Sequence, residues 1–273
     1  MKSENIISIY GLSQNPDTKD YIIILDYAEG GNFYDQLKKN YDQFDWILKI
    51  YSLCSIIEGL KIIHEKNMVH RDFHTGNLLA RYKLLTYAEN SVNISDMGLC
   101  GEISNIKDET KIYGVMPYVA PEVLKGKPYT QAADIYSFGM IMYFVATGRQ
   151  PFANCAHDEF LALKICNGIR PEVNEQEIPK CYINLMKICW DSNPDNRPDV
   201  YEVKDLLYSF RYNVEYFKEF KEAEKYRRAN ISSIENNNQA IHPKAYYTSR
   251  LLTSRVLNRC RCVNCGIRVS NNK

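Results

Sequence analysis

The sequence lacks any long hydrophobic run and any strong excess of charge. Its longest apolar runs, such as Tyr21 to Leu25, are far shorter than the ~20 residues that a membrane-spanning helix needs. The first five residues contain no apolar core of the kind found in a secretory signal. A formal net charge of +1 provides no overall attraction to nucleic acid. We therefore expect a cytoplasmic protein with no membrane span and no nucleic-acid partner.

The sequence also lacks a cysteine pattern that suggests disulfide bonds. The count of nine is odd, and most of the cysteines are scattered among apolar neighbours, which suits reduced core thiols in a cytosolic protein. Cys260, Cys262 and Cys265 cluster near the C-terminus and could form part of a zinc site. Such a site usually needs four ligands, however, and the nearest histidine is His242. The alternative is a basic, flexible tail with exposed thiols.

Length and composition allow one sizeable domain with an extension, or two smaller domains. The chain has 273 residues, of which 45% are hydrophobic and 25% charged, as is ordinary for a globular protein. Its charge is uneven, because residues 244–273 contain basic residues and no acidic ones. The body of the chain is therefore mildly acidic and its last thirty residues are basic.

One stretch concentrates side chains suited to phosphoryl transfer. Residues 70–77 read His-Arg-Asp-Phe-His-Thr-Gly-Asn, so Asp72 stands five residues before Asn77, and Asp96 follows nineteen residues later. Phosphoryl transfer needs a group that accepts the proton of an incoming hydroxyl and oxygen ligands that hold magnesium against the phosphates. Asp72 fits the first role. Asn77 and Asp96 fit the second, because magnesium takes oxygen donors.

This stretch resembles the catalytic loop of the eukaryotic protein kinases, H-R-D-x-x-x-x-N, which is followed in that family by D-F-G and A-P-E. Here the two later signatures read Asp96-Met97-Gly98 and Ala120-Pro121-Glu122. The patterns D-I-Y-S-F-G, from Asp134, and C-W-x-x-N-P-x-x-R-P, from Cys189, follow in the family's order. The resemblance is closest to the tyrosine kinase and tyrosine-kinase-like branches.

The resemblance covers residues 4 to 210 and implies an α+β, protein-kinase-like fold. It would consist mostly of the α-helical C-terminal lobe, with a remnant β-hairpin and hinge of the N-terminal lobe. The parts would be the remnant hairpin and hinge (1–31), the C-lobe (32–212), a charged helical extension (213–229) and a basic, disordered tail (230–273).

Local patterns give a coarse placement of the elements. The runs Ile6 to Tyr10 and Tyr21 to Leu25 flank turn-forming residues and predict an antiparallel hairpin. Apolar residues on nearly all sides predict a buried helix over Phe44 to Glu65. A last domain helix is predicted over Val200 to Phe210, followed by a charged helix over Glu215 to Arg228.

The resemblance implies a role for each candidate site residue. Asp72 would be the catalytic base, Asn77 and Asp96 would bind Mg²⁺, and His74 stands where Ser/Thr kinases have a lysine that contacts the γ-phosphate. ATP would be bound by the gatekeeper Leu25, backbone groups of Asp26 and Ala28, Asn32 at the ribose, Leu79 below the adenine, and Asp96. Structural or regulatory roles would fall to His70, Arg71, Met97, Gly98, Glu122, Asp134 and Arg197.

Three of these structural roles are specific. Asp134 would hold the backbone of the H-R-D turn, and Arg197 would pair with Glu122. Arg71 would bind a phosphate placed on the activation segment, for which the hydroxyl groups available are those of Ser104, Thr110 and Tyr113. The alternative is that these hydroxyls are ordinary loop residues.

The sequence departs from the family pattern in three places. It contains no G-x-G-x-x-G and no V-A-x-K, so the family's lid and cation over the phosphates are missing, and the hairpin would have no sheet to join. We therefore expect a truncated copy or an incomplete gene model that binds ATP weakly and catalyses poorly. His74 could contact a phosphate or be a solvated loop residue. Val115 replaces the threonine with which Ser/Thr kinases brace the base, so the choice between Ser/Thr and Tyr stays open.

The sequence thus predicts a protein kinase that transfers the γ-phosphate of ATP, with Mg²⁺, to a hydroxyl of a protein substrate. One alternative is a non-catalytic, kinase-like interaction module that recruits partner chains through its helical lobe. Another is a fragment that does not fold stably alone.

Overall fold

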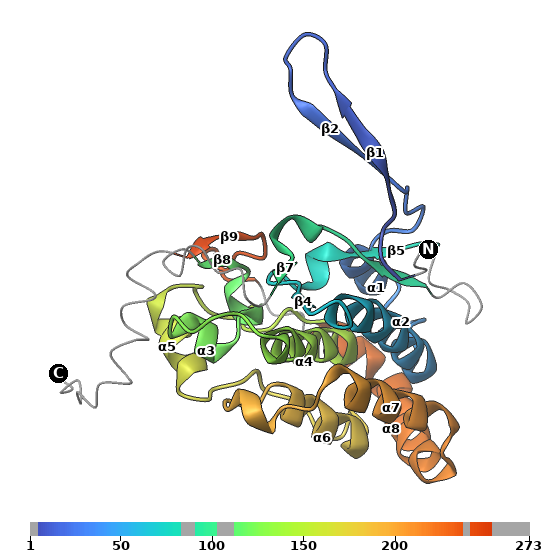
Figure 1. Cartoon of the computed structure of the whole chain (residues 1–273). Coiled ribbons are helices and arrows are strands. Elements are labelled where there is room, and N and C mark those ends of the chain that lie inside the picture. Colours follow the sequence, from blue (N-terminus) through green and yellow to red (C-terminus); the bar gives the residue numbers. More distant parts are fainter. Residues whose placement is uncertain (1–4, 83–90, 103–111, 237–240, 253–273) are drawn as a thin grey trace, which may run out of the picture.

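The chain forms a body of packed helices from which one β-hairpin projects (Figure 1). The structure, a computed structural model, describes residues 5–82, 91–102, 112–236 and 241–252. The helices are α1 (Phe33–Lys39), α2 (Trp46–His64), α3 (Pro121–Leu124), α4 (Gln131–Thr147), α5 (Glu159–Cys166), α6 (Lys180–Cys189), α7 (Val200–Tyr212) and α8 (Val214–Asn236). The strands are β1 (Ile9–Gln14), β2 (Tyr21–Leu25), β3 (Gly31–Asn32), β4 (Met68–Val69), β5 (Leu78–Ala80), β6 (Val92–Ile94), β7 (Gly101–Glu102), β8 (Ile112–Gly114) and β9 (Arg250–Leu252). Short 3₁₀ turns are η1 (Thr75–Asn77), η2 (Met97–Leu99), η3 (Met116–Tyr118) and η4 (Pro194–Asn196).

Helices α2 and α4 form the centre of the hydrophobic core. Helix α2 packs on α7, and α4 packs on both α2 and α6. Both central helices bury residues on nearly all sides, as the sequence of 44–65 predicted. The side chain of Asp45 caps α2 by accepting a hydrogen bond of 2.9 Å from the amide of Leu48. The predicted α+β class is confirmed.

A small antiparallel sheet connects the regions that contain the candidate site residues. Its strand order is β3-β5-β6. Asn32 of β3 lies opposite Leu79 of β5, and Leu79 lies opposite Asn93 of β6. The sheet therefore brings the predicted hinge, the end of the catalytic loop and the strand before Asp96 together. A second pair, β4 with β7, holds the start of the catalytic loop against the chain that follows η2.

The predicted hairpin is confirmed, although its first strand lies three residues later than expected. Residues 6 and 7 pair instead with β6, where the amide of Ile7 donates to the carbonyl of Ile94 at 2.9 Å. In the part of the chain that the structure describes, no further strand pairs with β1 or β2. Both faces of the hairpin are consequently exposed to solvent, as the exposed fraction of 58% for Ile23 illustrates.

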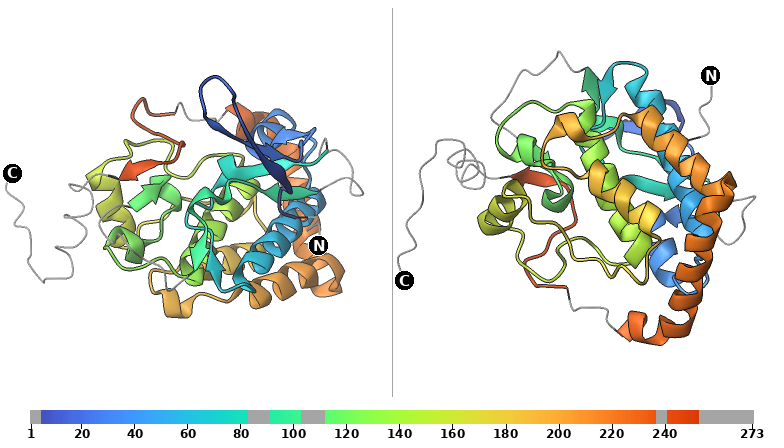
Figure 2. Two further views of the ribbon diagram at one scale, coloured as in Figure 1. Left: turned by 45° about the horizontal axis from the view of Figure 1, so that its top comes forward. Right: turned by 90° about the horizontal axis from the view of Figure 1, so that it is seen from below.

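The region after residue 229 contains more structure than the sequence predicted. Helix α8 extends to Asn236 and packs on α6 and α7 through the buried Phe220 and Ala223. Residues 241–252 return to the body, where β9 pairs with β8 and Leu252 is buried (Figure 2). The expectation of disorder is therefore wrong for these ranges. A strand of three residues has no periodic signal, and its stability comes from the surface it covers.

Two further expectations concern the C-terminus and membranes. The cysteines proposed as part of a zinc site, Cys260, Cys262 and Cys265, lie outside the described residues. Within the described ranges, no helix has both the length and the apolar character needed to cross a membrane.

The contrast between core and hairpin predicts effects of very different size for the same substitution. Ile56 is fully buried in α2, so Ile56→Ala should lower the free energy of unfolding by about 2–5 kcal/mol. Ile23→Ala on the exposed hairpin should change it by less than about 0.5 kcal/mol. Urea unfolding followed by circular dichroism measures both. A chain without a cooperative transition would instead support the fragment that does not fold alone.

Candidate active site

The catalytic loop is held in place by one buried carboxylate on α4. Asp134 accepts hydrogen bonds from the amide of His70 at 2.8 Å and from the amide of Arg71 at 3.2 Å. The Nε2 atom of His64 lies 3.0 Å from the same carboxylate. These contacts offset the cost of burying a charge. They match the role that the family resemblance implied for Asp134.

His70 and Arg71 support the turn in different ways. Burial lowers the pKa of His70, despite the opposing effect of Asp134, so its imidazole is neutral at pH 7 and supports the loop rather than carrying charge. The backbone of Arg71 is left-handed, with φ of 69°, an unfavourable conformation for a residue with a long side chain. Its guanidinium donates a 2.8 Å hydrogen bond to the carbonyl of Glu102, which helps to hold this conformation.

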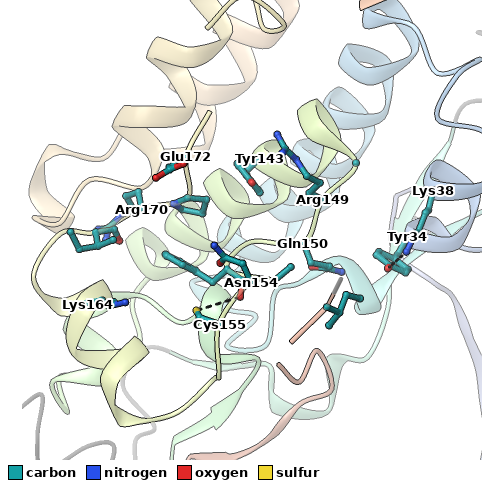
Figure 3. Close-up of a pocket in the computed structure, with 16 residues that line it drawn as sticks. Tyr34, Lys38, Tyr143, Arg149, Gln150, Asn154, Cys155, Lys164, Arg170 and Glu172 are labelled. Carbon is teal, nitrogen blue, oxygen red and sulfur yellow. Dashed lines mark hydrogen bonds between the residues drawn. The ribbon is translucent and has the colours of Figure 1, made fainter. Parts of the chain in front are cut away.

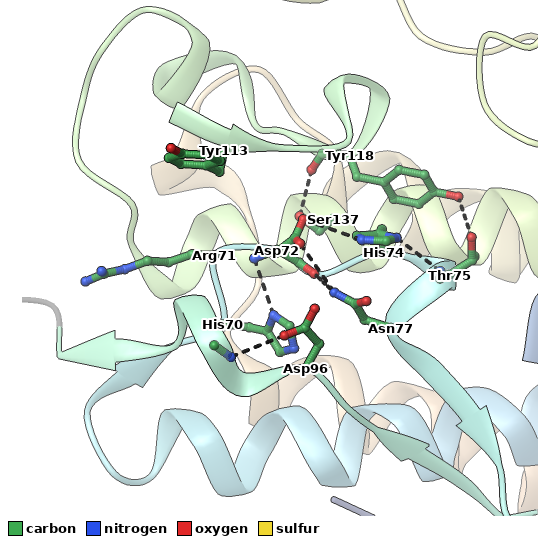
Figure 4. A network of polar contacts seen from close by, with 12 residues as sticks. His70, Arg71, Asp72, His74, Thr75, Asn77, Asp96, Tyr113, Tyr118 and Ser137 are labelled. Carbon is green, nitrogen blue, oxygen red and sulfur yellow. Dashed lines mark hydrogen bonds and ion pairs between the residues drawn. The ribbon is translucent and has the colours of Figure 1, made fainter. Parts of the chain in front are cut away.

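Asp72 is buried with one carboxylate oxygen left without a hydrogen bond. Its exposed fraction is 5%, and Oδ1 makes no hydrogen bond, although Nε2 of His74 lies 3.5 Å from it as an ion-pair contact (Figure 4). The amide nitrogen of Asn77 donates to the backbone carbonyl of Asp72 at 2.9 Å and approaches Oδ2 at 3.4 Å. A buried, unpaired carboxylate oxygen is costly unless a donor arrives. Oδ1 is therefore placed to accept a proton from a bound hydroxyl.

The residues predicted to hold magnesium are connected to each other. Because the nitrogen of the Asn77 amide is used by Asp72, its oxygen is the atom that remains for a cation. The amide and hydroxyl of Ser95 donate to the backbone carbonyl of Asn77 at 2.9 and 3.0 Å, which places the next residue, Asp96, beside the loop. Asp96 is left-handed, with φ of 55°, and its Oδ1 accepts a hydrogen bond of 3.4 Å from the amide of Gly98.

This pair of oxygen donors fits Mg²⁺ as it is bound in nucleotide sites. Magnesium keeps several waters and takes one or two protein ligands together with phosphate oxygens. Nowhere in the described part of the chain do three or more His, Cys, Asp or Glu side chains gather as a metal site. The donor set thus suits a cation that arrives with phosphates. Met97, between the two motif residues, is half-buried and packs against the core.

His74 is directed toward the predicted base. Its exposed fraction is 5%, its Nδ1 accepts a hydrogen bond of 3.0 Å from the amide of Gly76, and its Nε2 lies 3.5 Å from Oδ1 of Asp72. The interpretation of His74 as a solvated loop residue is therefore wrong. Contact between His74 and a γ-phosphate stays a prediction.

The pKa of Asp72 is lowered by its neighbours. Burial raises the pKa, but the close polar contact with His74 and its charge, with smaller contributions from Ser249 and His70, outweigh it. Asp72 is thus ionised at neutral pH, as a proton acceptor must be. Ser249 belongs to the C-terminal segment, and sequence analysis did not connect it with this site.

The residues predicted to contact the nucleotide lie along the hinge and β5. The amide of Asp26 donates to Ser8 at 2.8 Å, which leaves its carbonyl for an adenine, and the carbonyl of Ala28 accepts from Gly31 at 3.0 Å. Asn32 donates to the carbonyl of Gly76 at 3.0 Å and caps α1, so its side chain connects the hinge to the catalytic loop. Their contacts with ATP stay predictions, as do those of Leu79 and of Leu25, which is 46% exposed.

The buried pair Glu122–Arg197 fixes the end of the activation segment. Both terminal nitrogens of Arg197 lie 2.7 Å from the two carboxylate oxygens of Glu122, in a bidentate arrangement. Arg197 also donates to the carbonyls of Ala132 at 2.8 Å and Asp191 at 2.9 Å. This pairing matches the contact that the family resemblance implied.

A buried triangle of polar side chains connects the catalytic loop to the activation segment. The hydroxyl of Tyr118 donates to Gln150 at 2.6 Å, and Gln150 donates to Thr75 at 3.1 Å. The triangle closes between Thr75 and Tyr118 at 3.3 Å. Its members are far apart in the sequence and match no motif, so sequence analysis missed them. The triangle supplies a brace at the loop where Val115 has no hydroxyl to offer.

The predicted phosphate sites on the activation segment are only partly described. Ser104 and Thr110 lie outside the described residues. Tyr113 is partly exposed on β8, while the terminal nitrogen Nη2 of Arg71 points to the carbonyl of Glu102. Binding of a phosphate by Arg71 therefore stays a prediction.

A cavity of about 310 Å³ lies on the far side of the triangle and shares Gln150 with it (Figure 3). It is lined by polar and basic side chains that include Lys38, Arg149, Lys164 and Arg170, and by Ile241 from the C-terminal segment. None of the residues predicted to bind ATP or to catalyse the reaction lines it. The cavity is therefore not the nucleotide site, although the C-terminal segment runs along its edge.

Comparison with known proteins agrees with this geometry. Residues 1–207 match a family model described as "Protein tyrosine and serine/threonine kinase". The chain is 31% identical over 217 residues to the "Probable serine/threonine-protein kinase qkgA" of Dictyostelium discoideum, with 74% of this chain and 13% of that protein covered. It is 26% identical over 212 residues to "Serine/threonine-protein kinase STY46" of Arabidopsis thaliana, with 76% of this chain and 34% of that protein covered. The chain belongs to the protein kinase family, and it spans 13% and 34% of the length of these two relatives.

The Glu122–Arg197 pair predicts a large loss on removal of one partner. Arg197→Met leaves a buried, uncompensated carboxylate and should lower the free energy of unfolding by about 3–5 kcal/mol. The double variant Arg197→Met, Glu122→Leu should recover most of the lost free energy of unfolding. Arg197→Lys keeps the charge without the bidentate geometry, so its free energy of unfolding should lie between those of the unchanged chain and of Arg197→Met. Urea unfolding measures all three, and a loss below about 1 kcal/mol for Arg197→Met would indicate a pair as weak as one on the surface.

The contact between His74 and Asp72 predicts a change in the titration of the base. His74→Leu should raise the pKa of Asp72, because burial remains while the polar contact and the charge of His74 are lost. His74→Gln, which can donate without charge, should raise it less. Carbon-13 NMR of labelled aspartate measures each pKa. An Asp72 pKa unchanged in both variants would show that His74 does not act on the base.

The same contact predicts how the free energy of unfolding changes with pH. The pKa of Asp72 is lower in the folded than in the unfolded chain, so its ionised form stabilises the fold above the usual carboxylate value of about 4. This contribution is lost as the pH falls through the lowered folded value. His74→Leu should therefore lose stability at neutral pH and show a weaker dependence in acid.

Proposed function

We propose that this chain acts as a serine/threonine protein kinase, with Asp72 as the base and Asn77 and Asp96 as the ligands of Mg²⁺. The observation that carries the proposal is the unpaired Oδ1 of the buried Asp72, beside the amide of Asn77. When bound, magnesium and ATP would supply the phosphoryl group and neutralise its charge. The chain's own residues supply position and a proton acceptor.

The proposed roles follow from the contacts of each residue. Asp134 fixes the two amides before Asp72, so the base is held in one place. The lowered pKa keeps Asp72 ionised at neutral pH and thus able to accept the hydroxyl proton. Asn77 orients the carboxylate through its nitrogen and offers its oxygen to the cation. Positioning of this kind is the main contribution a protein makes to phosphoryl transfer.

Serine or threonine is the proposed acceptor. The support is that the relatives at 26% to 31% identity are named serine/threonine-protein kinases. Val115 lacks the hydroxyl that Ser/Thr kinases have at its position, and the triangle of Thr75, Tyr118 and Gln150 braces the loop from another side. We propose that this triangle serves the same purpose.

Turnover of these 273 residues is proposed to be slow. These residues contain neither a G-x-G-x-x-G loop nor a V-A-x-K lysine, which are the elements that cover and neutralise the phosphates in the family. The same observation favours a second candidate function, a kinase-like interaction module that transfers no phosphate. A test of nucleotide binding and a test of transfer separate the two.

The first test is whether Mg-ATP binds through Asp96. Mg-ATP should raise the melting temperature of the chain, and Asp96→Asn should abolish the rise, because the carboxylate that holds the cation is gone. Asp205→Asn, an exposed carboxylate on α7, is the matched control and should keep the rise. A rise that survives Asp96→Asn would contradict the assigned ligand.

The second test is transfer. Labelled ATP should deliver phosphate to a serine- and threonine-containing peptide library, and Asp72→Asn should lower the rate by about 10²–10⁴-fold while nucleotide binding persists. Transfer to tyrosine alone would contradict the proposed acceptor. Binding without any transfer would favour the interaction module.

A further inference from the structure

The C-terminal segment, residues 241–252, is held against the body by backbone and side-chain contacts. The amide of His242 donates to Ala153 at 2.9 Å, and the amide of His157 donates to Lys244 at 2.9 Å. The hydroxyl of Tyr247 donates to the carbonyl of Pro151 at 2.9 Å. The segment therefore follows a defined path across the surface between α4 and α5.

His157 is the centre of these contacts. Its side chain is buried, and its Nδ1 accepts a hydrogen bond of 3.1 Å from the amide of Tyr246. A terminal nitrogen of Arg250 donates to the His157 carbonyl at 2.8 Å, while its guanidinium lies over the ring of Tyr246. A histidine buried with these partners indicates a built contact rather than a loose chain end.

The segment ends as a strand on the activation segment. In the antiparallel pair of β8 and β9, Gly114 lies opposite Arg250 and Ile112 lies opposite Leu252, which is buried. Gly114 has φ of +144°, and a methyl group built on it would lie 3.6 Å from Oδ1 of Asp72. Strand β9 thus pairs directly with the strand, β8, whose Gly114 lies beside the predicted catalytic base.

Ser249 immediately precedes Arg250 of β9, which lies opposite Gly114 and so on the side of the catalytic base. Its hydroxyl is among the groups that lower the pKa of Asp72, after the larger effects of burial and of His74. A hydroxyl near an ionised carboxylate is the arrangement that a phosphate acceptor needs.

We propose that residues 241–252 occupy in cis the peptide-substrate groove of this kinase, which is the surface along β8 beside Asp72, and that Ser249 is the phosphate acceptor. In this step Oγ of Ser249 forms a bond to the γ-phosphorus of ATP, and the bond from that phosphorus to the β,γ-bridging oxygen breaks. ADP leaves with the electron pair, and the hydroxyl proton goes to Asp72. The inference rests on the proposed function, because it uses the same base and the same ATP.

A tethered acceptor suits an enzyme with slow turnover. Holding two reacting groups together in one molecule replaces a bimolecular encounter by an intramolecular step. The product, a phosphoserine beside the carboxylate of Asp72, would be repelled by it. Phosphorylation should thus release the segment and open the groove, which the unmodified segment covers, to other substrates.

The experiment uses the full chain with Mg-ATP and maps phosphate by mass spectrometry over a hundredfold range of protein concentration. Phosphate should appear on Ser249 with a first-order rate constant that does not change with concentration. Ser249→Ala should abolish that signal, and Asp72→Asn should do the same. Thr248→Ala removes the neighbouring hydroxyl and is the matched control, which should leave Ser249 phosphorylated.

A second variant tests occupation of the groove. Leu252→Asp places a charge at a buried position of β9 and should detach the strand from β8. Phosphate on Ser249 should then fall to background, while phosphate on an added serine and threonine peptide library should rise several-fold.

The possible outcomes distinguish phosphorylation of Ser249 in cis from the proposed kinase function. A library that is phosphorylated while Ser249 is not would overturn the inference and leave the proposed kinase function standing. A rate on Ser249 that rises with protein concentration would overturn the cis reaction. Phosphate on neither would overturn the proposed function, and the inference with it.

Discussion

The buried carboxylate of Asp134 is the constraint on which the rest of the site depends. It lies in the first turn of α4 and receives two backbone amides of the catalytic loop and the side chain of His64, the last residue of α2. One charge therefore fixes two core helices and the loop relative to each other. The loop can keep an unfavourable left-handed Arg71 only because these contacts over-determine it.

From that anchor, contacts extend in two directions. Toward the nucleotide, Asn77 and Ser95 connect the loop to Asp96 through hydrogen bonds of 2.9 and 3.0 Å. Toward the acceptor, Thr75 and Tyr118 connect it to the activation segment, and β8 then supplies an edge for β9. The proposed acceptor side thus lies within the helical body. The proposed donor side includes the hairpin, whose two faces are exposed to solvent.

How much of the site the sequence could predict depended on how far apart in the sequence the contacting residues lie. Asp72, Asn77 and Asp134 belong to motifs with fixed spacing, so the sequence alone predicts that they lie in one site. Contacts of the C-terminal segment could not be predicted, since Arg250 reaches His157 across 93 residues and a three-residue strand has no pattern of its own. The burial of His74 beside Asp72 could not be predicted from the sequence either. A histidine in a loop is usually solvated, and only the packing around it shows that it faces the base.

The imbalance between the two sides bears on which acceptor the chain can serve. Under the proposed slow turnover, transfer is limited by how often both reactants are present together. An acceptor from solution would have to meet the nucleotide-bound state, whereas the proposed tethered hydroxyl would already be there when that state forms. The two proposals together therefore favour a reaction on the chain's own segment over one on a diffusing protein, for as long as that segment remains paired with β8.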